Sequence, residues 1–82
     1  MVVLEVFLHP GCPSEQPARR LAQEIQQEYS NWQVRVIGSK DRARKLGISV
    51  LPAFVLNGRA IAVGVPRKEW LIGLLRELNP DG

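Results

Sequence analysis

The sequence AFVLNGRAIAV at residues 53–63 predicts a β-hairpin. Two short apolar runs, Ala53 to Leu56 and Arg59 to Val63, flank the dipeptide Asn57-Gly58. Asn followed by Gly is the pair best suited to a two-residue turn in which both residues take positive φ. The two runs are therefore expected to form adjacent antiparallel strands.

Upstream of the hairpin, the pattern predicts a strand, a helix and a second strand. Residues 2–8 are a nearly continuous apolar run rich in β-branched side chains, which is typical of a central strand covered on both faces. After a short loop, Ser14 can cap a helix that has Pro17 in its first turn and ends near Ser30-Asn31. Residues 32–37 alternate in polarity and predict the next strand. A unit of this length implies a right-handed parallel crossover.

Two further helices complete the predicted order. The basic segment from Asp41 to Leu46 is expected to be a short helix that ends at Gly47, and a longer helix is expected after Pro66. The predicted buried stripe of that last helix consists of Leu71, Leu74, Leu75 and Leu78, and both Trp70 and Ile72 are expected to widen it. Residues 79–82 are predicted to be a frayed tail.

The order strand, helix, strand, helix, strand, strand, helix predicts one α/β domain over residues 1–82. A parallel crossover followed by a hairpin gives a four-stranded mixed sheet, with the first strand between the second and the third. We expect the first and last helices on one face and the short helix on the other. Because the sequence offers no disulfide and no metal staple, the hydrophobic core must supply the stability.

The composition is that of a globular protein. Hydrophobic residues make up 45% and charged residues 23% of the chain, a balance that excludes disorder. The net charge of +3 favours an acidic partner only weakly. The basic residues Lys40, Arg42, Arg44 and Lys45 form either a docking patch or a solvated face, and without interleaved aromatic residues we expect no nucleic-acid partner.

The N-terminal residues bear on localisation. They lack a basic leader, and Glu5 interrupts an apolar stretch far shorter than the roughly 20 residues of a membrane span. We therefore expect neither a signal peptide nor a membrane partner. A lone thiol without an export signal favours the cytoplasm, and a monomer is expected.

Cys12 is the only cysteine, and it lies at the junction of the first predicted strand and helix, in LHPGCPSE at residues 8–15. Thiol–disulfide enzymes carry a Cys-x-x-Cys pair at such a junction. Here the fourth position is Glu15, so no internal disulfide can form. One Cys and one His are also too few ligands for a zinc site within one chain. The thiol therefore acts alone or with a second molecule, unless it is an inert remnant.

Three segments resemble the thioredoxin-like superfamily, and more narrowly its small glutaredoxin-like and thioredoxin-like proteins. They are Glu5 to Pro13, Gly47 to Gly58, and Gly64 to Pro66. Together with the element order, the resemblance covers essentially the whole chain. It implies the minimal thioredoxin fold, βαβαββα, with a degenerate Cys-x-x-Cys motif at residues 12–15.

The resemblance also implies roles for individual residues. Cys12 would be the catalytic nucleophile, beside a cis peptide bond before Pro52. The backbone of Leu51 would hold an extended peptide or glutathione, and Pro13 would share this substrate-binding surface. The motif differs, however, from the Cys-Gly-Phe-Ser signature of monothiol glutaredoxins that bridge iron–sulfur clusters.

Two functions are compatible with this site. In the first, the protein is a monothiol oxidoreductase: Cys12 attacks a protein or glutathione disulfide, and an external thiol such as glutathione resolves the adduct. In the second, it is a catalytically inactive module that binds or regulates a partner. Apart from glutathione, no cofactor is expected.

Three side chains are candidate modulators of the thiol. His9 could hydrogen-bond the sulfur, or it could be a solvated loop histidine. Glu15 would disfavour a thiolate at Cys12 if the two side chains faced the same way. Glu5 could accept the proton of the thiol, or it could be a structural residue paired with a basic side chain such as Arg35.

Overall fold

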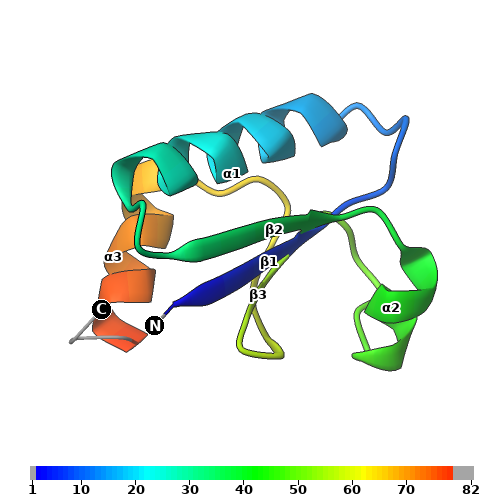
Figure 1. The fold of residues 1–82 in the computed structure, drawn as a ribbon. Coiled ribbons are helices and arrows are strands. Elements are labelled where there is room, and N and C mark those ends of the chain that lie inside the picture. The colour runs from blue at the N-terminus through cyan, green and yellow to red at the C-terminus, as the bar shows by residue number, and fades with distance from the viewer. Residues whose placement is uncertain (1, 79–82) are drawn as a thin grey trace.

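The computed structural model, which describes residues 2–78, contains a four-stranded mixed sheet (Figure 1). The strands are β1 (Val3–Phe7), β2 (Gln33–Ile37), β3 (Ala53–Leu56) and β4 (Arg59–Val63), in the spatial order β2-β1-β3-β4. β1 runs parallel to β2 and antiparallel to β3. The predicted sheet, with its first strand inside, is confirmed. The tail predicted at 79–82 lies outside the described residues.

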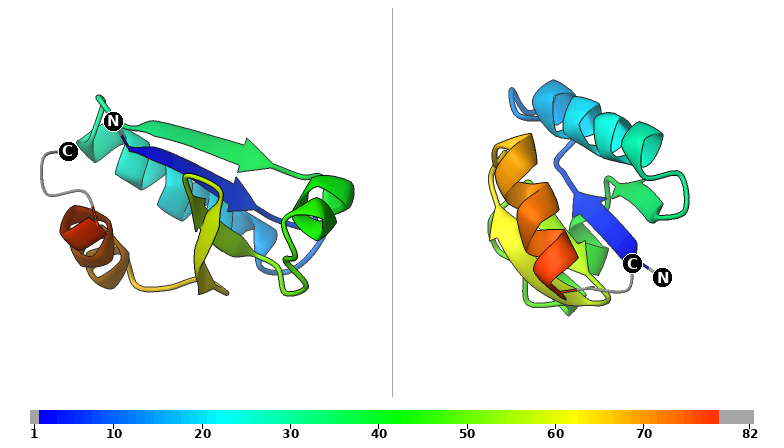
Figure 2. Two further views of the ribbon diagram at one scale, coloured as in Figure 1. Left: turned by 90° about the horizontal axis from the view of Figure 1, so that it is seen from below. Right: turned by 90° about the vertical axis from the view of Figure 1, so that its left-hand side faces the viewer.

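The helices of residues 2–78 are α1 (Glu15–Glu28), α2 (Lys40–Lys45) and α3 (Lys68–Leu78). The side chains of α1 and α3 share one hydrophobic cluster with the sheet, and α2 contributes to a second cluster on the other face (Figure 2). The α/β class and the βαβαββα order are therefore as predicted.

Alternation along the strands explains the two layers. Leu4 and Val6 of β1 enter the larger cluster beneath α1 and α3, whereas Phe7 enters the smaller one beside α2. Successive strand side chains point to opposite faces. β3 is buried at all of its residues because it is covered on both sides.

The hairpin turn has the predicted geometry. Asn57 has φ of 50° and Gly58 has φ of 85°, so both turn residues occupy the left-handed region. The pairing of β3 with β4 shifts register between Phe54 and Val55, an irregularity that the sequence pattern does not reveal.

The start of α1 differs from the expectation for Ser14. This residue stands at the N-cap, but its own backbone is helical and its side chain makes no capping hydrogen bond. Its carbonyl accepts the N–H of Ala18 at 3.1 Å, so the cap is formed by the backbone alone. At the other end, α1 stops at Glu28, and Tyr29 stacks on Trp32 with ring centroids 4.1 Å apart.

The buried stripe of α3 is narrower than predicted. Leu71 and Leu75, four residues apart, are fully buried against the sheet. Trp70 is 53% exposed and Leu78 is 50% exposed, so the prediction that Trp70 widens the buried face is wrong. The same prediction holds for Ile72, which is partly buried and packs against the larger cluster. A side chain next to a buried helical position points about a quarter-turn away from it.

Candidate active site

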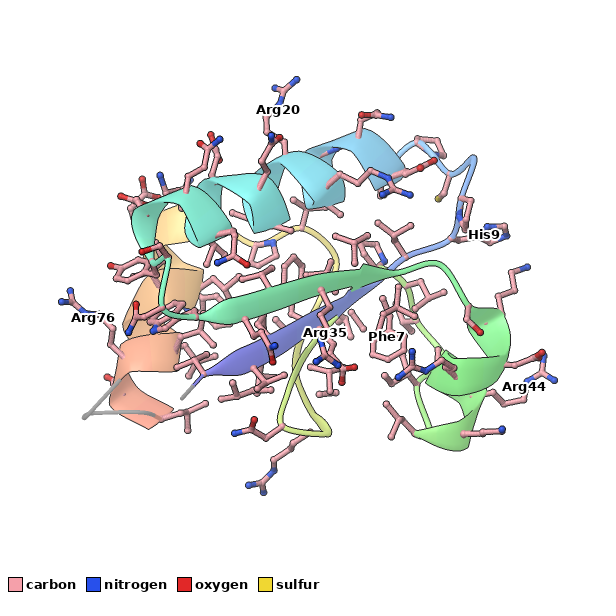
Figure 3. All side chains as sticks on the ribbon, in the orientation of Figure 1. Phe7, His9, Arg20, Arg35, Arg44 and Arg76 are labelled. Carbon is pink, nitrogen blue, oxygen red and sulfur yellow. The ribbon has the colours of Figure 1, made fainter. Side chains whose placement is uncertain are left out.

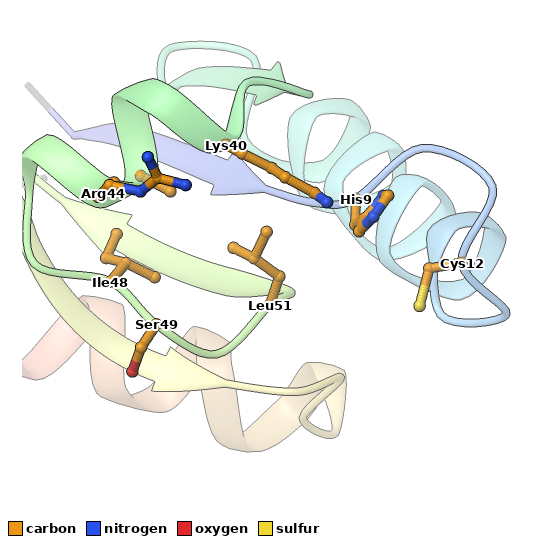
Figure 4. Close-up of a pocket in the computed structure, with 8 residues that line it drawn as sticks. His9, Cys12, Lys40, Arg44, Ile48, Ser49 and Leu51 are labelled. Carbon is orange, nitrogen blue, oxygen red and sulfur yellow. The ribbon is translucent and has the colours of Figure 1, made fainter.

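An open groove of about 460 Å³ lies where the parallel strands β1 and β2 end, between the loop after β1 and helix α2 (Figure 4). Three segments line it: the loop after β1, helix α2, and the connection from α2 to β3. The lining residues are His9, Cys12, Lys40, Ala43, Arg44, Ile48, Ser49 and Leu51.

Cys12 is partly buried in a tight turn before α1. Its N–H donates to the carbonyl of His9 at 3.1 Å, and its carbonyl accepts the N–H of Glu15 at 3.0 Å. Gly11 has φ of +86°, where a Cβ would strain the backbone although nothing lies within 4 Å of it. The turn therefore fixes the thiol at the edge of the groove, at the N-terminal end of α1.

Glu15 ties this turn to the helix. Its Oε1 accepts the N–H of Gly11 at 2.8 Å, and its Oε2 accepts Nε–H of Arg19 at 2.8 Å. The hydrogen bond from Gly11, and after it the bond from Arg19, hold the pKa of Glu15 below its ordinary value of 4.5. The carboxylate that replaces a second cysteine is thus engaged by the loop backbone and by a cation.

His9 projects from the loop at the end of the molecule where α2 lies (Figure 3). The ring is exposed, and its Nδ1 lies 2.9 Å from the carbonyl oxygen of Pro10. Among residues 2–78, this contact is the hydrogen bond that the ring makes, and the sulfur of Cys12 is not its partner. Of the two predicted roles of His9, the structure therefore shows the exposed loop histidine. It nevertheless lines the same groove as Cys12.

Glu5 does not share the groove with Cys12. It is on the α2 side of β1, where its Oε2 lies 3.6 Å from Nη2 of Arg42, and it lines a separate cavity. A basic partner was expected, but Arg35 was the wrong one. The Cα of Arg35 is opposite that of Glu5, but the side chain of Arg35 donates a hydrogen bond to Gln33. The cation beside Glu5 is Arg42, which comes from α2.

Leu51 and Pro52 adjoin the groove from the β3 side. The peptide bond between them is cis. Pro52 is buried and its carbonyl accepts the N–H of Gly64 at 2.7 Å, whereas Leu51 is half-buried and lines the groove. Among residues 2–78, neither backbone group of Leu51 has a hydrogen-bond partner. Pro13 is exposed on the loop, outside the groove lining.

Sequence reasoning did not find the groove residues of α2. Lys40 and Arg44 were recognised only as members of a basic cluster, because the side of α2 that meets Cys12 is set by tertiary packing. Within residues 2–78, no group of three or more His, Cys, Asp or Glu side chains is placed to hold a metal ion. No helix in the same part of the chain is long and apolar enough to cross a membrane.

A four-stranded mixed sheet in the order β2-β1-β3-β4 with three helices, and a single cysteine just before α1, is the arrangement of the thioredoxin-like superfamily. The chain is 30% identical over 83 residues to a probable thioredoxin of Archaeoglobus fulgidus, covering 96% of this chain and 91% of the relative. It is also 29% identical over 80 residues to a thioredoxin of Methanocaldococcus jannaschii, covering 93% and 94% respectively. The chain therefore belongs to the thioredoxin family. No protein-family model matches it.

Solved structures agree on the fold. Oxidised thioredoxin from Plasmodium falciparum superposes with a TM-score of 0.72 at 17% identity, covering 94% of this chain and 80% of that one. A chain solved in work on the thiol resolving mechanism of yeast mitochondrial 1-Cys peroxiredoxin gives a TM-score of 0.74 at 18% identity, covering 93% and 77%. Family membership links this chain to thiol–disulfide redox chemistry.

Proposed function

We propose that the protein is a monothiol thiol–disulfide oxidoreductase with Cys12 as its nucleophile. The observation that carries the proposal is that Cys12 and Leu51 line one groove, next to the cis bond before Pro52. Leu51 has a free backbone N–H and C=O among the described residues, so a substrate backbone can pair there while its disulfide meets the sulfur.

The proposed reaction has two exchange steps. The Cys12 thiolate attacks one sulfur of a disulfide R–S–S–R′, a Cys12–S–S–R bond forms, and R′–S⁻ leaves and takes up a proton. An external low-molecular-weight thiolate, with glutathione as the proposed source, then attacks the sulfur of R. Cys12 leaves as a thiolate, and the net products are R–S–S–glutathione and R′–SH. No second cysteine of this chain is needed.

Alkylation of the native and unfolded protein tests the reactivity of Cys12. Iodoacetamide at about pH 6 should label the native protein faster than the same chain in concentrated urea, since only a stabilised, accessible thiolate gains from folding. Intact-mass spectrometry measures both rates, and Cys12→Ser is the blank. Slower labelling of the native protein would exclude the proposed nucleophile.

Turnover separates the enzyme from the second candidate, a module that binds a partner without catalysis. Glu15 in place of a second cysteine is the observation that favours the module. With a peptide disulfide and excess reduced glutathione, the enzyme should release several equivalents of thiol per protein above the rate with glutathione alone, and Cys12→Ser should not exceed that uncatalysed rate. Release of a single equivalent of thiol per protein, with no further catalysed release, would show that the protein does not turn over and would favour the binding module.

A further inference from the structure

We infer that the groove selects disulfides lying in acidic protein segments, and that Lys40 and Arg44 are its specificity-determining residues. The inference deepens the proposed function and rests on it, because the selected disulfide is the one that Cys12 attacks. Three observations support it: the sides of α2 from which its basic residues project, the absence of ion pairs to Lys40 and Arg44 within residues 2–78, and the backbone groups beside the groove that have no hydrogen-bond partner in the same range.

The basic residues of α2 divide between two sides of the helix. Lys40 and Arg44, four residues apart and so on one helical face, line the groove with Cys12. Figure 4 shows Lys40 extending from α2 toward His9. Arg42 and Lys45 line the other cavity, where Arg42 meets Glu5. The basic cluster of the sequence is therefore two separate features, and only one of them concerns the thiol.

Within residues 2–78, no ion pair compensates the positive charge of the groove. The ion pairs of residues 2–78 involve Arg19, Arg42 and Lys68, and neither Lys40 nor Arg44 is among them. No acidic residue of the described chain lines the groove. An incoming carboxylate would supply the missing partner, which favours its encounter and its orientation.

The backbone beside these cations favours a protein segment over a small thiol as the occupant. Residues 49–51 make no backbone hydrogen bonds within the described chain, and Ser49 and Val50 are exposed. This run can pair with an extended peptide of similar length. The apolar side chains of Ile48 and Leu51 offer contacts to the aliphatic parts of that peptide, while Lys40 and Arg44 meet its acidic side chains.

Three peptide probes test the selection. Each carries one cysteine as a mixed disulfide with the same chromogenic aromatic thiol, and they differ only in the flanking residues, which are Glu, Gln or Lys. The rate of thiol release under single-turnover conditions measures attack by Cys12. At low ionic strength the acidic probe should react about tenfold faster than the basic probe, as expected for two exposed charge contacts. High salt should reduce this ratio.

Adjacent residues of α2 provide the matched control. Arg44→Glu and Lys45→Glu change the net charge equally, but only Arg44 lines the groove. Arg44→Glu, and likewise Lys40→Glu, should bring the acidic-to-basic ratio below about twofold, whereas Lys45→Glu should keep most of the preference. An equal loss in Arg44→Glu and Lys45→Glu would mean that overall charge, not the groove, sets the rate, and would overturn the inference.

The neutral probe separates this inference from the proposed function. If the Gln-flanked probe reacts and all three probes react equally, Cys12 is the nucleophile but the selection is refuted. If no probe reacts, the proposed function fails first. Glutathione carried as a mixed disulfide with the same aromatic thiol is the remaining arm: a faster reaction with it than with the acidic peptide, lost in Arg44→Glu, would assign the groove to a small anionic disulfide and overturn the protein-segment substrate.

Discussion

The backbone N–H of Gly11 donates a 2.8 Å hydrogen bond to Oε1 of Glu15, so the residue in the fourth position of the motif holds the loop that carries Cys12. Arg19 binds the other carboxylate oxygen from the next turn of α1. In a two-cysteine motif this position supplies a second sulfur. Here it supplies a carboxylate that fastens the turn to the helix, which makes Glu15 a positioning residue.

Acidification should loosen this attachment. The pKa of Glu15 is lowered, first by the Gly11 N–H and then by Arg19, so folding favours its ionised form. The stabilisation is present above the ordinary value of 4.5 and is lost as the pH falls through the lower folded value. We expect the free energy of unfolding of Glu15→Gln to fall less steeply than that of the wild type between about pH 6 and about pH 3.

Urea unfolding at a series of pH values measures this difference. Glu77→Gln is the matched control, because Glu77 is exposed and makes no ion pair within residues 2–78. Its pH dependence should follow that of the wild type. Identical slopes for Glu15→Gln and the wild type would show that the carboxylate does not support the loop.

Glu5 should have no part in the chemistry of the thiol. Glu5 lines a cavity together with Arg42, whereas Cys12 lines the groove on another side of α2. Glu5→Gln should therefore leave the rate of Cys12 alkylation within about twofold of the wild type. Loss of a proton acceptor would cost roughly 100-fold or more. A loss of that size, measured by the same mass-spectrometric assay, would return Glu5 to the site.

The fold was largely predictable because its signals are local. The Asn57-Gly58 dipeptide dictates a turn with two positive φ values, and the nearly continuous apolar run of β1, which only Glu5 interrupts, requires cover on both faces. These two features set the order of the sheet. The cap at Ser14 was less predictable, because a side-chain cap requires a non-helical backbone, and the turn around Cys12 makes that backbone helical.

The site was predictable only at the positions that the motif marks. Cys12 and Leu51, the two residues that the resemblance singles out, both line the groove, but the groove side of α2 depends on how that helix packs over β1 and β3. The partner of Glu5 was missed for the same reason. Arg35 is opposite Glu5 in the pairing of β1 with β2, which can be anticipated from the strands. The ion pair is instead formed between Glu5 in the sheet and Arg42 in α2, which depends on how the helix packs on the sheet.

Gln26 joins the end of α1 to β2 and should be an important polar residue for stability. Its Nε2 donates to the carbonyls of Trp32 at 2.7 Å and Tyr29 at 3.3 Å, and its Oε1 accepts the N–H of Val34 at 3.1 Å. Gln26→Ala leaves these partly buried groups without their partner, which should lower the free energy of unfolding by about 1–3 kcal/mol.

The neighbouring glutamine provides the comparison. Gln27 is exposed, and Gln27→Ala should change the free energy of unfolding by less than about 0.5 kcal/mol. Chemical unfolding in urea gives both values by linear extrapolation. Equal effects of the two substitutions would mean that water replaces the Gln26 hydrogen bonds without cost.

Leu71 and Trp70 form an adjacent pair that tests the narrow buried stripe of α3. Leu71 is 0% exposed between the helix and the sheet, whereas Trp70 is 53% exposed. Leu71→Ala should lower the free energy of unfolding by about 2–5 kcal/mol through lost apolar burial and the remaining cavity. Trp70→Ala should change it by no more than about 1 kcal/mol, although it removes the larger side chain. Urea unfolding followed by far-ultraviolet circular dichroism measures both, since loss of a tryptophan alters the fluorescence signal. A larger loss at Trp70 than at Leu71 would mean that α3 presents a different face to the sheet.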